Sequence, residues 1–156
     1  ERPGCRPLPP LQPCGIHCLS GERITMNYQL HDYEIDSVTF EGNQIIFSFP
    51  KGYYVTDQHG KEVTPLRKKL IFIIDRGWCE NCPVESFVYI RQRKRFGWKD
   101  ISVKQFLALF KKGNMIVHDE YDSKLSNWKM LQINAKAKWS NIEMFVTDVE
   151  EILCQE

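Results

Sequence analysis

Alternating apolar and polar positions run through most of the chain after residue 26 and predict β-strands. Residues 33–40 alternate, residues 41–44 are turn-forming, and residues 45–49 form the return strand of a hairpin. The near-continuous apolar run at 69–75 predicts a central strand that is covered on both faces. Further strand candidates are residues 53–55, 86–93, 115–117, 128–135 and 142–149, the last two joined as a hairpin across 136–141.

One amphipathic helix is expected at residues 102–112. Ser102 and Gln105 have the spacing of a capping box, and Gly113 suits the position just past the helix end. The apolar stripe consists of Val103, Phe106, Leu107 and Phe110. The pattern therefore predicts an α+β fold: a strongly curled antiparallel sheet of about seven strands, whose apolar side is sealed by this one helix.

The composition of the chain changes at Met26. Five of the eight prolines and three of the six cysteines precede it. Because proline fixes φ and removes a backbone donor, residues 1–25 are expected to form neither a helix nor a central strand. This segment is either a flexible arm or a translated upstream region; the second is favoured, because codons for residues 21–23 can form a purine-rich ribosome-binding string. Residues 26–156 are predicted to be a single globular domain.

The chain shows no apolar segment of the kind found in a secretory signal, and its longest wholly apolar run is residues 70–74. A cytoplasmic protein without a membrane partner is therefore expected. If the first 25 residues are not native, only Cys79, Cys82 and Cys154 remain, and a reduced state is favoured.

Charge is unevenly distributed, although the net charge is only +1. Residues 67–112 contain twelve basic and four acidic side chains, whereas residues 119–156 contain eight acidic side chains and four lysines. Folding either brings these two regions together, which cancels their fields, or leaves one basic face.

The basic run 91–95 is the candidate contact for nucleic acid or another polyanion. A strand would place Arg91, Arg93 and Arg95 on one face, with Phe96 and Trp98 nearby for stacking. The predicted binding residues are Arg91, Arg93, Lys94, Arg95 and Trp98. The favoured interpretation of this run is nevertheless a solvated strand end that pairs with acidic residues from the last third of the chain.

Tryptophans form a second candidate surface. Trp78, Trp98, Trp128 and Trp139 all lie next to predicted turns or strand ends. Aromatic side chains at such positions are typical of recognition surfaces, although a structural role in the core or at its rim is favoured.

The pair Cys79-x-x-Cys82 has the spacing of a zinc site or a redox dithiol. Zinc would need two more ligands, for which Cys14, His17 and Cys18 are candidates. The favoured interpretation is that these are ordinary loop cysteines, so no cofactor is expected and zinc remains the alternative.

Two histidine–carboxylate clusters are the candidate catalytic groups. They are His31-Asp32 and His118-Asp119-Glu120, which could converge into the site of a metal-dependent hydrolase. Turn and edge positions are the favoured explanation of both clusters. The sequence has no GxSxG, HExxH, P-loop or GxGxxG motif, so catalysis is not expected.

The segment 30–49 begins Leu30-His31-Asp32 and continues with Ile35, Val38, Phe40, Asn43, Ile46, Phe47 and Phe49. This pattern resembles the opening of small uncharacterised bacterial α+β domains, some of which resemble immunity proteins of contact-dependent or polymorphic toxin systems. The resemblance implies a bacterial cytoplasmic protein that binds a protein partner, and carries over no functional residue. Partner binding in an immunity-like role is thus the first expectation, polyanion binding the second and hydrolysis the third.

Overall fold

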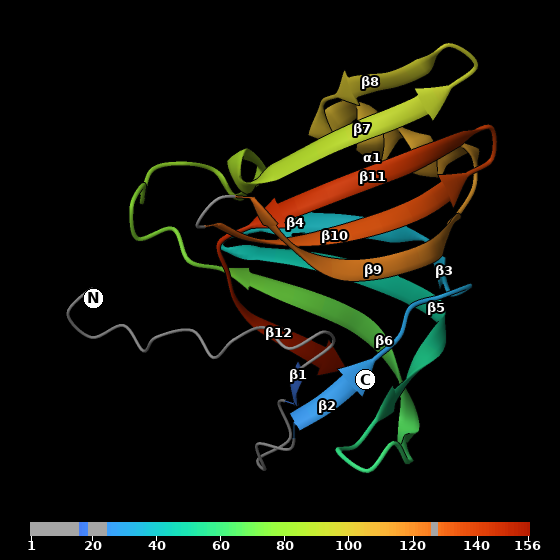
Figure 1. The fold of residues 1–156 in the computed structure, drawn as a ribbon, viewed down its shortest axis with the longest axis vertical. Helices are drawn as coiled ribbons and strands as arrows, with labels where there is room; N and C mark the ends of the chain where they lie inside the picture. Colours follow the sequence, from blue (N-terminus) through green and yellow to red (C-terminus); the bar gives the residue numbers. More distant parts are fainter. Residues whose placement is uncertain (1–15, 19–24, 126–127) are drawn as a thin grey trace.

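The structure, a computed structural model, describes residues 16–18, 25–125 and 128–156. Its strands form two six-stranded sheets (Figure 1). In spatial order, sheet A contains β2 (Thr25–Tyr28), β1 (Ile16–Cys18), β12 (Val149–Gln155), β6 (Glu62–Ile74), β5 (Gln44–Thr56) and β4 (Ser37–Glu41). Sheet B contains β3 (Glu34–Ile35), β9 (Met115–Leu125), β10 (Trp128–Ala137), β11 (Ser140–Thr147), β7 (Val88–Lys94) and β8 (Gly97–Ile101). Among the described strands, neighbours run antiparallel except for β1 and β12.

The two sheets share one hydrophobic core. Sheet A contributes Phe47, Phe49 and Phe72, and sheet B contributes Ile133 and Met144, all of them buried. In Figure 1 the strands β9, β10 and β11 pass in front of β4 and β5. Each sheet therefore buries one face against the other, as alternating apolar and polar positions require.

The predicted antiparallel α+β character is confirmed, but the single strongly curled sheet of about seven strands is wrong. The apolar side of sheet A is covered by sheet B, and the helix has a smaller role. Two candidate strands, 45–49 and 53–55, belong to one long strand, β5. Two further stretches without clear alternation also form strands: residues 62–68 are the first part of β6, and residues 149–155 form β12. The resulting strands are long enough and numerous enough to form a second layer.

The helix α1 (Val103–Leu109) begins as predicted. The Ser102 hydroxyl accepts a hydrogen bond from the backbone N–H of Gln105, whose side chain accepts one from the backbone N–H of Ser102. The α-helix is shorter than the expected 102–112, because the 3₁₀ turn η2 (Phe110–Lys112) takes over its last turn. Phe106 is buried, and Figure 1 shows α1 behind β7 and β8. The helix covers this part of sheet B and does not seal a whole sheet face.

Two hairpin turns lie side by side at one end of sheet B. Lys94 pairs with Gly97 across the first, and Ala137 pairs with Ser140 across the second, so each turn has two residues at its tip. The strands β7 and β11 are neighbours, and Arg93 pairs with Asn141 next to both turns. Figure 1 shows the two turns at the same end of the molecule. The predicted hairpin across 136–141 is confirmed.

The first part of the predicted strand 86–93 has another structure. The 3₁₀ turn η1 (Val84–Phe87) precedes β7, and it places Phe87 in the core. The predicted strand 86–93 is therefore wrong for residues 86 and 87, whereas Tyr89 lies on β7 and is exposed.

Residues 16–18 form β1 between β2 and β12, so the expectation that residues 1–25 contain no central strand is wrong for these three residues. Residues 1–15 and 19–24 lie outside the described residues, so the domain boundary at residue 26 stays a prediction. None of the helices in the described ranges is both long and apolar enough to cross a membrane.

Candidate functional site

Two adjoining hollows lie between the β7–β8 hairpin, the end of α1 and the β10–β11 turn. The first is about 310 Å³ in volume and the second about 580 Å³, within the range of small-ligand sites. Both are lined by Gln92, Lys94, Leu109 and Lys112, which form their common boundary. We call the two hollows together the basic cleft.

Five cationic side chains line the basic cleft: Lys94, Arg95, Lys99, Lys112 and Lys138. Its lining contains no Asp or Glu. Among the described residues none of these five forms an ion pair, and all five are exposed. Like charges held this close create a positive potential that attracts anions.

Each hairpin turn presents a cation followed by an aromatic residue. Arg95-Phe96 occupies the tip between β7 and β8, and Lys138-Trp139 occupies the tip between β10 and β11. Phe96 is 97% exposed and Trp139 is 81% exposed. Trp139 lines the first hollow, whereas Phe96 lines the second. Burying either side chain against a ligand would remove much apolar surface from water.

The inner end of the basic cleft is polar and buried. Gln92 is 8% exposed and its side-chain nitrogen donates a 2.9 Å hydrogen bond to the hydroxyl oxygen of Ser140. The period of two along β7 explains this position, because Gln92 and Lys94 face the α1 side while Arg91 and Arg93 face the opposite side. The hydrogen bond holds β7 and β11 together beneath the two turns.

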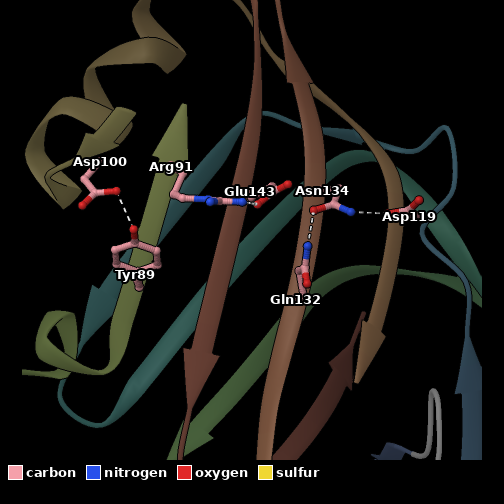
Figure 2. A network of polar contacts seen from close by, with 7 residues as sticks. All are labelled: Tyr89, Arg91, Asp100, Asp119, Gln132, Asn134 and Glu143. Carbon is pink, nitrogen blue, oxygen red and sulfur yellow. Dashed lines mark hydrogen bonds and ion pairs between the residues drawn. The ribbon is translucent and has the colours of Figure 1, made fainter. Parts of the chain in front are cut away.

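On the opposite, outer face of sheet B, a row of polar residues crosses five strands. Asp119, Asn134, Glu143, Arg91 and Asp100 are register partners on β9, β10, β11, β7 and β8. Figure 2 shows their side chains with those of Tyr89 and Gln132. Asn134 donates a 2.7 Å hydrogen bond to Asp119 and accepts one of 2.9 Å from Gln132.

Arg91 is the most fully engaged member of this row. Its Nε donates a 3.1 Å hydrogen bond to Oε2 of Glu143, and its Nη2 pairs with the same oxygen. This hydrogen bonding raises the pKa of Arg91 above its ordinary value. The guanidinium carbon also lies 4.9 Å from the ring centre of Trp98 and 5.9 Å from that of Phe145.

Tyr89 lies beside this cluster and donates its hydroxyl hydrogen to Asp100. That hydrogen bond raises the pKa of the Tyr89 phenol above its ordinary value. The Tyr89 ring is 5.8 Å from that of Phe145, and Tyr89 is 46% exposed. On the outer face, aromatic side chains thus surround an arginine whose positive charge is balanced by the carboxylate of Glu143.

The predicted basic strand end is therefore divided between two surfaces. Arg91 and Arg93 lie on the outer face, with Arg93 in register with Trp98. Lys94 and Arg95 line the basic cleft. The expectation that Arg91, Arg93 and Arg95 share one strand face is wrong for Arg95, because β7 ends at Lys94 and Arg95 is in the turn. Trp98 contacts Arg91 and also lines the second hollow.

Sequence reasoning did not assign Lys99, Lys112 and Lys138 to this site. The last two come from distant segments and meet Lys94 only through the fold. For Trp139 the sequence did point to a recognition role, because this tryptophan lies next to a predicted turn. Among the other tryptophans, Trp78 is 56% exposed and contacts Phe87 and Asp148, whereas the Trp128 side chain lies outside the described residues.

Among the described residues, two ion pairs join the basic region 67–112 to the acidic region 119–156. Arg91 pairs with Glu143, and Arg67 pairs with Glu156 at 3.0 Å. One of the five predicted binding residues, Arg91, thus pairs with an acidic residue from the last third of the chain, as the solvated-strand-end interpretation expected. The other four form no ion pair with the described residues. The five cationic side chains of the basic cleft form no such ion pair with the described residues, so the cleft remains positively charged.

The two histidine clusters converge, as the hydrolase hypothesis requires. Nδ1 of His31 donates a hydrogen bond to the carbonyl oxygen of His118, and Nε2 of His31 lies 3.2 Å from Asp32. The first contact, followed by the charge of Asp32, raises the pKa of His31 above 6.5. Glu120 instead accepts a 3.1 Å hydrogen bond from the backbone N–H of Leu30.

These groups are placed at the surface. His31, Asp32, His118 and Asp119 are exposed. In the described part of the chain, no three His, Cys, Asp or Glu side chains are arranged to hold a metal ion. The contacts seen here join a turn to β9, which is a structural role.

Cys79 and Cys82 are joined by a disulfide in the loop after β6, so the expectation of reduced, ordinary loop cysteines is wrong for this pair. Arg76 braces this loop through a 3.1 Å hydrogen bond to the carbonyl oxygen of Cys82. Of the suggested additional zinc ligands, Cys14 and the side chains of His17 and Cys18 lie outside the described residues. A zinc site in the reduced protein stays a prediction.

Comparisons of the chain with protein families, with curated proteins and with solved structures give no significant match. The resemblance of residues 30–49 to immunity-like bacterial domains therefore stays a prediction, and function has to be argued from the site itself.

Proposed function

We propose that this chain is a nucleic-acid-binding protein whose contact surface is the basic cleft. The observation that carries the proposal is the lining of the cleft: five cationic side chains without a carboxylate, next to two almost fully exposed aromatic rings. Phosphates are bound by unpaired lysine and arginine side chains, and bases stack on exposed aromatic rings.

The basic run 91–95 is split between the outer face of sheet B and the basic cleft, and this split favours the cleft as the contact surface. The Arg91 charge is matched by Glu143, so a phosphate there would compete with an existing carboxylate. Lys94 and Lys112 face no such competitor among the described residues. The binding residues in this proposal are Lys94, Arg95, Lys99, Lys112 and Lys138, with Phe96 and Trp139.

The test is the salt dependence of affinity for labelled oligonucleotides, measured by fluorescence anisotropy between about 50 and about 200 mM KCl. Each phosphate contact contributes a slope of about −0.7 to −0.9 in log K against log salt. Lys94→Gln and Lys112→Gln should each weaken binding and reduce the slope by roughly this amount.

Lys68→Gln is the matched control, because Lys68 is an exposed lysine on β6 of sheet A. It should leave affinity and slope unchanged. Binding that does not depend on salt, or equal losses in all three variants, would contradict the proposal.

The outer face of sheet B favours a second candidate function, docking of a protein partner. Tyr89, Trp98 and Phe145 surround Arg91 there, and Tyr, Trp and Arg are the residue types that dominate binding energy at protein interfaces. An immunity-like role would use such a face. A copurified or genetically linked partner whose affinity falls at least tenfold with Tyr89→Ala, but not with Trp139→Ala, would support it.

A further inference from the structure

The basic cleft has two compartments of similar character. Trp139 stands at the first hollow, and Phe96 stands at the second. Lys94 and Lys112 line both hollows and so lie where the two meet. The order along the cleft is thus aromatic, cation pair, aromatic.

This order matches the repeat of a single nucleic-acid strand. A base is followed by a phosphate and then by the next base, and a base can stack on an aromatic ring whatever its identity. In a duplex the bases are stacked and paired inside the helix, so they cannot enter separate hollows. The two volumes, about 310 and 580 Å³, are each in the range of sites that accept small ring-containing ligands.

We infer that the basic cleft takes two successive nucleotides of a single strand, one base against Trp139 and the next against Phe96, with the phosphate between them on Lys94 and Lys112. This inference rests on the proposed function and narrows its ligand to single strands. Gln92 lines both hollows and limits how deeply each base enters, and its hydrogen-bond partner Ser140 lines the first hollow beside it.

The hollows alone do not distinguish DNA from RNA, so both are included in the test. The probes are fluorescein-labelled oligothymidylate and oligouridylate of about eight nucleotides, an abasic deoxyribose-phosphate oligomer with the same number of phosphates, and a DNA duplex with as many base pairs. Affinities are compared at one salt concentration by anisotropy. Stacking predicts that a thymidine or uridine strand binds at least about tenfold more tightly than the abasic strand.

Two variants locate the bases. Trp139→Leu and Phe96→Leu should each lower affinity for the thymidine strand about tenfold and leave affinity for the abasic strand unchanged. Both side chains are exposed, so both variants should fold, which circular dichroism checks. Tyr54→Leu is the matched control, since Tyr54 is an exposed aromatic residue on β5 of sheet A.

The outcomes separate the inference from the proposed function. Equal binding of the abasic and thymidine strands, or tighter binding of the duplex, overturns the inference and leaves the proposed nucleic-acid binding intact. No binding of any oligonucleotide overturns both. Preference for polyglutamate or for phosphatidylserine vesicles over every oligonucleotide also overturns both, because the cleft would then serve an acidic protein or a membrane surface.

Discussion

The side-chain amide of Gln92 donates its hydrogen bond to the hydroxyl of Ser140, and this pair joins β7 to β11 directly below the two turns. Both residues are buried. A buried donor that loses its acceptor costs more than the bond itself contributes, because the donor stays desolvated. The pair therefore adds a buried side-chain hydrogen bond to the backbone ladder between β7 and β11 at the inner end of the basic cleft.

Ser140→Ala should lower the free energy of unfolding by about 1–3 kcal/mol, because it leaves the Gln92 amide without its partner. The double variant Gln92→Leu with Ser140→Ala should cost less than the sum of the single changes, since both polar groups are then gone. Guanidinium chloride unfolding measures all four proteins. Strictly additive costs would show that the two residues do not depend on each other.

Gly52→Ala should destabilise the protein more than Gly60→Ala. Both glycines have positive φ, +75° and +77°, so both substitutions carry the cost of about 1–2 kcal/mol for a side chain in that conformation. A Cβ at residue 52 would also lie 3.0 Å from Cβ of Leu66, whereas nothing lies within 4 Å at residue 60. Thermal unfolding of the two variants isolates the effect of this contact, and equal melting temperatures would argue against it.

Arg91→Gln and Lys94→Gln should affect different properties of the protein, the first its stability and the second its affinity for oligonucleotides. Arg91→Gln removes a partly buried ion pair and two ring contacts, so it should reduce the free energy of unfolding by about 1 kcal/mol and leave oligonucleotide affinity nearly unchanged. Lys94→Gln should reduce affinity and leave stability nearly unchanged. Denaturant unfolding and anisotropy on both variants provide the comparison; a larger affinity loss for Arg91→Gln would move the binding surface to the outer face.

The pH dependence of stability should contain a contribution from His31. Its pKa is raised in the folded state by the His118 carbonyl and by Asp32, so the protonated form is favoured by folding. This contribution is complete below pH 6.5, the ordinary value, and is lost as the pH rises through the higher folded-state pKa.

Melting temperatures of the wild type and His31→Gln should therefore differ most at acidic pH and converge at alkaline pH. His59→Gln, in the exposed turn between β5 and β6, controls for the loss of a surface histidine. A difference that grows with increasing pH would contradict the assignment, because it has the opposite sign.

Local signals in the sequence predicted local structure well. The capping box of Ser102 and Gln105 lies within four residues, and it forms as expected. The hairpin at 136–141 likewise depends on a turn between two alternating segments. The second sheet was missed because β-strands choose partners far away in the chain, and alternation does not show whether a strand's apolar face meets a helix or another sheet.

For the basic cleft, too, the sequence predicted the residues that lie in one short segment and missed those from distant segments. Lys94, Arg95, Phe96 and Trp98 lie in one short basic run, so sequence alone brought them together. Lys112 and Lys138 could not be added, because their proximity depends on η2 and β11 reaching the same end of sheet B. The separation of Arg91 from Lys94 follows from strand alternation, whereas the neutralisation of Arg91 depends on the register that places Glu143 opposite it.

The positions that would recognise a ligand and the positions that stabilise the fold are largely different residues. Phe96 and Trp139 occupy two-residue tips and contribute nothing to the shared core. Evolution can therefore exchange either dipeptide with little penalty to folding, as surface turns generally allow. The same independence makes the paired tips a practical place to graft new specificity by directed evolution.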